Sequence, residues 1–223
     1  MKKIFLLLTF TVSQMVFSQE ITKNVGDFSI VKVFDRISVQ LIPASENKVI
    51  ITGSKKEDVE LINKNGELKI RMALKKLLKG DNVEATVYYK KLEGIEASEG
   101  SFVGCDAIVE TTNFILNAKE GSEIKVKLNT NKTTIKASSG GKIIVSGTTD
   151  NQDVLVNSGA ILEAKDFKSK QTTISINAGG EADIYATDFV DAKVRAGGDI
   201  LIYGKPKQIN QKTIAGGSIT EVK

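Results

Sequence analysis

The stretch that decides the fold is LNAKEGSEIKV (residues 116–126), which returns as IKASSGGKIIV (135–145) and as VLVNSGAILEA (154–164). In each copy a glycine is followed by a small residue. Apolar residues stand three and five positions before that glycine, and three and five positions after it. This alternation is typical of two half-buried strands. The small residues between them indicate a tight corner where the strands meet.

Residues 95–223 carry this pattern seven times. The corner glycines are separated by 21, 19, 19, 20, 18 and 19 residues, and they are Gly100, Gly121, Gly140, Gly159, Gly179, Gly197 and Gly216. One copy cannot bury its apolar face alone, so successive copies are expected to stack. We therefore predict an all-β fold, a parallel β-solenoid with coils of about 19–20 residues. An antiparallel sandwich with a hairpin at each glycine is the alternative, but it would not need equal residue sizes at equal offsets.

The first half of the chain is less regular. Residues 1–18 are interpreted as a signal peptide cleaved after Ser18, because basic Lys2 and Lys3 precede an apolar run and small residues. An uncleaved anchor is the alternative.

Residues 19–94 are predicted to form irregular N-terminal β coils that continue into the regular coils of 95–223, so that 19–223 is one domain. A separate small domain is the alternative. Strands are expected at 28–33, 36–42, 48–53, 59–62, 67–72 and 83–89, with a tight turn at Asn65 and Gly66.

The composition limits the chemistry that the chain can perform. The formal charge is +4, and +2 without Lys2 and Lys3, which does not favour nucleic-acid binding. There is no histidine, the commonest general base and metal ligand. No run after the leader is long and apolar enough to cross a bilayer. Cys105, the single cysteine, shares its inward offset with Val126 and Val145, so we expect it to be buried. We expect no cofactor and no metal, and the oligomeric state stays open.

The order of several motifs resembles that of a known family. They are FSIVKVF (28–34), ISVQL (37–41), NGELKI (65–70), LEGIEASEGS (92–101) and IYGKP (202–206). The chain is similar over about residues 26–222 to the autotransporter adhesin head domain, also called the head GIN domain, of exported Bacteroidetes proteins. The resemblance implies a right-handed parallel β-helix and an exported location. It supplies no catalytic residues.

Two features are candidates for partner binding. The segment LKKLLK (residues 74–79) is basic and amphipathic, so Lys75, Lys76 and Lys79 could contact an anionic membrane or an acidic glycan. A solvated loop or short capping helix is the alternative. Phe102 stands at an outward offset, where it could stack on a sugar, although scattered surface aromatics are common.

Other residues are assigned structural roles. Asn157 and Asn177 occupy one offset in adjacent coils and could form an amide ladder. Calcium binding would need converging oxygen ligands, for which turn or surface roles are preferred instead at Asp150, Asp153, Asp183, Asp188 and Asp191.

The sequence thus favours a non-catalytic structural or binding protein of the periplasm or cell surface. It would be adhesin-like and present a rigid face to a glycan or another envelope component. The alternative is a polysaccharide-acting enzyme, a lyase or hydrolase, which would need convergent carboxylates or a Lys/Arg base in an outward groove.

Overall fold

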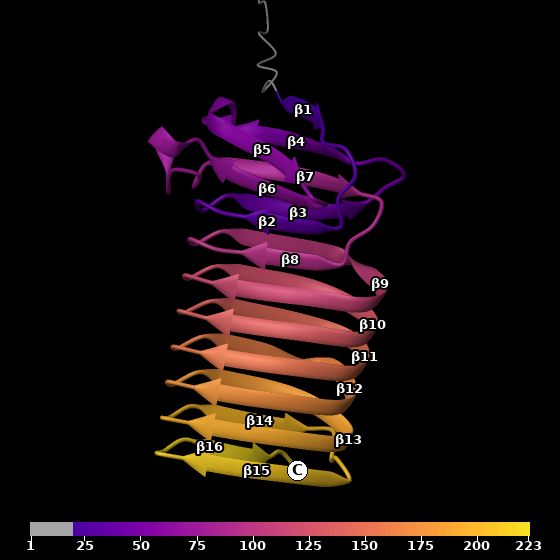
Figure 1. Cartoon of the computed structure of the whole chain (residues 1–223), viewed down its shortest axis with the longest axis vertical. Coiled ribbons are helices and arrows are strands. Elements are labelled where there is room, and N and C mark those ends of the chain that lie inside the picture. Colours follow the sequence, from indigo (N-terminus) through magenta and orange to yellow (C-terminus); the bar gives the residue numbers. More distant parts are fainter. Residues whose placement is uncertain (1–19) are drawn as a thin grey trace, which may run out of the picture.

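Long strands that bend round a tube build most of the molecule. The computed structural model describes residues 20–223 and is a β-solenoid of about seven turns (Figure 1). The predicted signal peptide lies outside the described residues. The long strands each run from one glycine corner to the next, and they are β9 (Phe102–Lys119), β10 (Glu123–Ser138), β11 (Lys142–Asn157), β12 (Ile161–Asn177) and β13 (Glu181–Arg195).

The coils stack in parallel and in register. Ile124 of β10 pairs with Ile143 of β11, which pairs with Leu162 of β12. The chain winds right-handed as it descends from the N-terminal end (Figure 1). The parallel β-solenoid is confirmed, and the antiparallel sandwich is wrong. Each coil from β9 to β13 is one continuous, bent strand.

The predicted inward residues fill the tube. Ile124, Ile143 and Ile184 are completely buried, and Cys105 is 2% exposed. Each buried Val or Ile contributes roughly 1.5–3 kcal/mol to the free energy of unfolding. The stacked inward residues are therefore the main source of stability. The amide ladder is also present, since Nδ2 of Asn177 donates to Oδ1 of Asn157 at 2.9 Å.

The corner glycines are required by backbone conformation. At the corner before β10, Glu120 and Gly121 have φ angles of 56° and 69°. A Cβ on Gly121 would meet nothing within 4 Å, so space does not select the glycine there. The next position is different, because a Cβ on Gly141 would lie 2.4 Å from the carbonyl oxygen of Ala118. Only small residues fit that second position, where successive coils approach closely.

An additional coil precedes the regular ones. It consists of β2 (Ile30–Val33) and β3 (Ser38–Pro43), which pair in parallel with β8 (Gly94–Ala97) and β9. Its corner is formed by Asp35 and Arg36, whose φ angles are 62° and 64°. The sequence pattern did not identify this corner because an arginine stands where the other coils have glycine.

The order of the coils along the tube differs from their order in the sequence. The segment 44–93 leaves the first coil and folds back over its open side. There β6 (Glu67–Met72) pairs in parallel with β2, and β7 (Val83–Tyr89) pairs in parallel with β3. The β2–β3 coil therefore lies between two coils that follow it in the sequence.

Antiparallel strands close this end of the tube. β4 (Lys48–Gly53) pairs with β7, and β1 (Ile21–Asn24) pairs with β4. β5 (Val59–Lys64) forms a hairpin with β6 through the predicted Asn65–Gly66 turn. These three strands differ from the coils expected for the N-terminal half. The predicted bounds 48–53, 67–72 and 83–89 are nevertheless those of the structure, while the domain boundaries stay a prediction.

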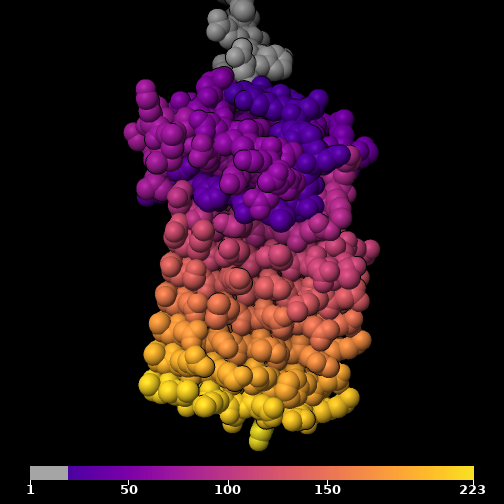
Figure 2. Space-filling model, viewed as in Figure 1, coloured from indigo at the N-terminus to yellow at the C-terminus, as the bar shows by residue number. Residues whose placement is uncertain are grey.

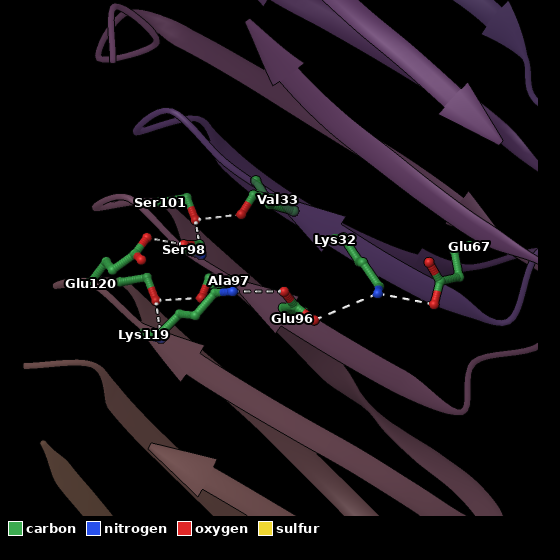
Figure 3. A network of polar contacts seen from close by, with 10 residues as sticks. Lys32, Val33, Glu67, Glu96, Ala97, Ser98, Ser101, Lys119 and Glu120 are labelled. Carbon is green, nitrogen blue, oxygen red and sulfur yellow. Dashed lines mark hydrogen bonds and ion pairs between the residues drawn. The ribbon is translucent and has the colours of Figure 1, made fainter. Parts of the chain in front are cut away.

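A polar network joins the added segment to the regular coils (Figure 3). Nζ of Lys32 on β2 lies 2.9 Å from Glu67 on β6 and 3.7 Å from Glu96 on β8. Lys119 on β9 continues the row at 3.3 Å from Glu96. The hydrogen bond that Lys32 donates to Glu67, and less so the charge of Glu96, raises the pKa of Lys32. Beside this row, Oγ of Ser122 donates to the carbonyl of Ala97 at 2.7 Å and ties two coils at the corner.

Shorter strands form the last coils. β14 (Asp199–Tyr203) and β15 (Gln208–Ile214) pair in parallel with β13, and β16 (Ser218–Glu221) pairs in parallel with β14. All sixteen described strands belong to one sheet.

The alternation of inward and outward residues along each strand can be tested by substituting two adjacent residues. Ile143→Asp buries an unpaired carboxylate among completely buried neighbours, and we expect it to lower the free energy of unfolding by about 4 kcal/mol or more. The same change at the adjacent outward residue, Ile144→Asp, is expected to cost about 1 kcal/mol. Urea denaturation of both variants measures the difference. Equal losses would show that the two side chains do not face opposite sides of the strand.

Candidate binding surfaces

The three predicted lysines lie in a loop that stands out from the tube. We call residues 73–82, between β6 and β7, the basic tip (Figure 2). Residues 74–79 are all exposed. The side chain of Leu74 is 69% exposed, Leu77 49% and Leu78 46%. The segment is a loop with a single 3-10 turn at Leu74–Lys76, rather than the short capping helix considered as an alternative. The tip thus presents three leucines and three lysines together.

A buried carboxylate holds this loop in place. The side chain of Asp35 is 1% exposed and accepts hydrogen bonds from the backbone N–H of Leu78 at 2.7 Å and of Met72 at 3.0 Å. The carbonyl of Asp35 also accepts from the N–H of Gly80 at 3.0 Å. Leu78 has a φ of 59°, which is strained for a branched side chain. The anchor at Asp35 holds Leu78 in that conformation.

A second basic segment lies against the tip. The 3-10 turn Lys56–Asp58 precedes β5, and the N–H of Ala73 donates to the carbonyl of Asp58 at 2.8 Å. Nζ of Lys55 donates to the carbonyl of Lys79 at 3.0 Å. Within residues 20–223, none of Lys55, Lys56, Lys75, Lys76 and Lys79 forms an ion pair. Their charges are therefore available to a partner.

Phe102 belongs to a different surface. Its ring is 36% exposed and lines a shallow groove of about 160 Å³ together with Gln40 and Thr86. None of the three predicted lysines lines that groove. The structure therefore does not bring Phe102 and the lysines together.

A larger, polar groove follows the edge where the long strands bend. We call it the bend groove; its volume is about 600 Å³. It crosses successive coils on β9 to β13, and its residues lie about midway between one glycine corner and the next. The residues that line it are Glu110, Thr111, Thr112, Asn129, Thr130, Asn131, Thr148, Thr149, Asp150, Lys168, Ser169, Lys170 and Thr187.

Equivalent residues of neighbouring coils contact one another along the bend groove. Oγ1 of Thr148 donates to Oδ1 of Asn129 at 3.0 Å, and Nδ2 of Asn131 donates to Asp150 at 3.2 Å. Lys170 lies 2.7 Å from the other oxygen of Asp150. The hydrogen bond from Lys170, followed by that from Asn131, lowers the pKa of Asp150. This carboxyl therefore stays ionised at neutral pH.

Buried hydroxyl groups fix the floor of the bend groove. Oγ1 of Thr130 lies 2.7 Å from that of Thr133 and donates to that of Thr149 at 2.9 Å. One coil further on, Ser169 donates to the carbonyl of Tyr185 at 2.7 Å. These bonds hold the bends rigidly in register. The sequence carries a partial signal for this groove, because the polar runs 129–131 and 148–150 stand eight to ten positions after Gly121 and Gly140. The pattern is weaker in other coils, where Ile108 and Phe167 stand eight positions after the corner glycine.

The remaining candidates keep structural roles. Cys105 packs inside the tube with its Sγ 3.6 Å from the hydroxyl of Tyr89, and burial raises the pKa of its thiol. Asp188 and Asp191 pair with Lys207 and Lys193. Among residues 20–223 no group of three or more Cys, Asp or Glu side chains is placed to hold a metal ion.

Comparison with protein families gives one match. Residues 27–206 match the family described as "Putative auto-transporter adhesin, head GIN domain". The chain belongs to this family. The comparison with curated proteins found no match.

Solved structures share the fold of this head GIN domain. A protein from Bacteroides fragilis described as a "putative adhesin" is 18% identical with a TM-score of 0.83, covering 92% of this chain and 97% of that one. A "putative adhesin" from Parabacteroides distasonis is 21% identical with a TM-score of 0.74, covering 92% and 96%. A "Putative lipid binding protein" from the same species is 18% identical with a TM-score of 0.69, covering 92% and 96%. At these identities the likeness shows the fold.

The Asp35 anchor can be tested by proteolysis. Asp35→Ala removes two charge-assisted hydrogen bonds, so we expect a loss of about 3 kcal/mol in stability and release of the basic tip. Trypsin should then cut after Lys75, Lys76 or Lys79 about tenfold faster than in the wild type, because local opening exposes the backbone. Mass spectrometry of the fragments measures this.

Asp81→Ala is the matched control, since it removes an exposed ion pair with Arg36 at the same corner. Equal cleavage of the Asp35→Ala and Asp81→Ala variants would contradict an anchoring role for Asp35.

Proposed function

We propose that this head GIN domain is an exported, non-catalytic binding protein that holds a glycan of the cell envelope along the bend groove. The observation that carries the proposal is the repetition of hydroxyl, amide and charged groups at the same position of successive coils. A polymer of similar sugar units can meet equivalent groups about every 4.8 Å along the stack. Many weak contacts then add up, as in other multivalent binding.

The size and rigidity of the bend groove support this use. Its volume of about 600 Å³ falls within the roughly 300–1,000 Å³ of ligand sites. Its side chains are already bonded to one another, as in the Asn131–Asp150–Lys170 row. Little conformational entropy is lost on binding when the groups are held in advance.

The charges in the bend groove favour binding without turnover. A glycosidase needs one carboxyl kept protonated by a raised pKa beside a second, ionised one. The two described carboxyls with raised pKa values are Glu99 and Asp183, both because of burial, and neither lines the groove. Asp150, which does line it, has a lowered pKa. Asp150 is therefore unsuited to the role of the protonated acid in a glycosidase.

The exported location rests on the family description and on the predicted leader at residues 1–18. The part of the chain that the structure describes has no helix long and apolar enough to cross a membrane. We place the protein in the periplasm or at the cell surface, where envelope glycans are accessible.

A glycan array with the purified protein tests the proposal. The triple variant Asn131→Ala, Asp150→Ala, Lys170→Ala removes the central polar row, and we expect affinity for any bound glycan to fall at least about tenfold, since each lost hydrogen bond to a charged group is worth roughly 1.5–3 kcal/mol. The matched control is Lys142→Ala, Glu163→Ala, which removes an interstrand ion pair of the same 2.7 Å length away from the groove.

Unchanged glycan binding by the groove variant would overturn the site. Release of shorter saccharides from the bound glycan by the wild-type protein would instead establish the enzymatic alternative.

A further inference from the structure

We infer that the basic tip docks onto an anionic lipid surface and inserts its leucines at the level of the headgroups. This inference concerns a second surface and does not depend on glycan binding in the bend groove. It rests on the exposed leucines, the surrounding lysines and the anchored backbone of residues 73–82.

The leucines of the tip are exposed to solvent in the described part of the chain. Leu74, Leu77 and Leu78 are consecutive or nearly so, and each exposes about half or more of its side chain. Other large exposed hydrophobic residues, such as Ile108 and Ile161, stand on different strands. A contiguous group of exposed apolar side chains marks an interaction site. Burial of these leucines against a partner surface would therefore be favourable.

The lysines indicate which partner surface could bind the apolar and the basic side chains of the tip at the same time. Lys75, Lys76 and Lys79 alternate with the leucines, and Lys55 lies beside them through its bond to the carbonyl of Lys79. Basic residues beside exposed leucines are the composition of segments that lie in the membrane interface. The ammonium groups would meet lipid phosphates while the leucine side chains enter the acyl boundary. An acidic glycan would pair with the lysines but would leave the leucines in water.

The loop is also built to hold this arrangement before contact. The Asp35 carboxylate bonds the N–H groups of Met72 and Leu78, and the Asp35 carbonyl accepts from Gly80. Those bonds keep Leu78 in the left-handed region, with its side chain exposed. A rigid tip loses little entropy on docking, so a short segment can bind where a flexible one would not.

The position of the tip leaves the bend groove open. The tip occupies the corner between β6 and β7, next to the Asp35–Arg36 corner, and all corners lie on one edge of the tube (Figure 1). The residues of the bend groove lie about midway between successive corners, and the long strands bend at the edge opposite the corners (Figure 1). A molecule docked through its tip would therefore present the groove away from the lipid.

Vesicle co-sedimentation with the purified protein tests the inference. We expect binding to vesicles of phosphatidylglycerol and phosphatidylethanolamine, weak binding to phosphatidylcholine vesicles, and weaker binding at high salt. Lys75→Gln, Lys76→Gln, Lys79→Gln should reduce binding by about fivefold per lysine, or about a hundredfold in total. Leu74→Ser, Leu77→Ser, Leu78→Ser should reduce it at least about tenfold.

The control variants make similar changes of charge and polarity at exposed positions outside the basic tip. Lys125→Gln, Lys127→Gln, Lys136→Gln removes three exposed lysines from β10, and Ile108→Ser removes an exposed apolar side chain from β9. Both should bind as the wild type does. Circular dichroism melting checks that all variants are folded.

A single-tryptophan reporter distinguishes insertion from surface attraction. The chain has no tryptophan, so Leu77→Trp introduces the only indole. Its emission should shift to the blue on addition of anionic vesicles, as expected for transfer into the acyl boundary.

Three outcomes would overturn the inference. The first is unshifted Leu77→Trp emission with vesicles bound. The second is a loss of binding in the control variants that equals the loss in the tip variants. The third is a wild-type dimer in sedimentation velocity that dissociates in the leucine variant, which would assign the tip to a second copy of the chain.

Discussion

The hydrogen bonds between successive coils are the constraint on which the rest of the structure depends. Because neighbouring strands pair in parallel and in register, each residue meets the residue at the same position of the next coil. Ile124, Ile143 and Leu162 form one such row inside the tube, and Asn157 and Asn177 form another at the corner. One register therefore produces the apolar core, the amide ladder and the polar rows of the bend groove.

The N-terminal end of the tube shows how the stack of parallel coils is capped by short antiparallel strands. A free coil would expose unpaired N–H and C=O groups. Residues 44–93 fold back so that β6 and β7 cover the β2–β3 coil, and β4, β5 and β1 then pair antiparallel. The connection between β6 and β7 is long enough to protrude, and it forms the basic tip. The capping of the tube and the second candidate surface thus arise from the same insertion.

The sequence predicted the parts of the fold that repeat. Gly121, Gly140 and Gly159 recur at nearly constant spacing with equal neighbours, which determined the coil and its inward residues. It could not predict the stacking of β6 on β2, because single-copy pairings leave no periodic pattern. The Asp35–Arg36 corner was missed for a related reason: its left-handed backbone is held by side-chain and backbone bonds to the tip rather than by glycine.

The candidate surfaces were partly visible in the sequence. Lys75, Lys76 and Lys79 stood out as a local charge pattern, whereas the anchoring of their loop by Asp35 needed coordinates. The sequence does not reveal the bend groove, because the residues that line it come from five separate segments, each an ordinary polar stretch. Phe102 was correctly placed on the outside, but no other predicted partner-binding residue lies with it.

Cysteine cross-linking tests the register most directly. Lys125 and Ile144 are paired neighbours on adjacent coils. Their Cα atoms are about 4.8 Å apart, within the roughly 4.4–6.8 Å that a disulfide spans. In a Cys105→Ala background, Lys125→Cys with Ile144→Cys should form an intramolecular disulfide under mild oxidation. Lys125→Cys with Ser146→Cys, two residues out of register, should remain largely reduced. Equal oxidation of both pairs, or oxidation of the second pair alone, would contradict the in-register stack.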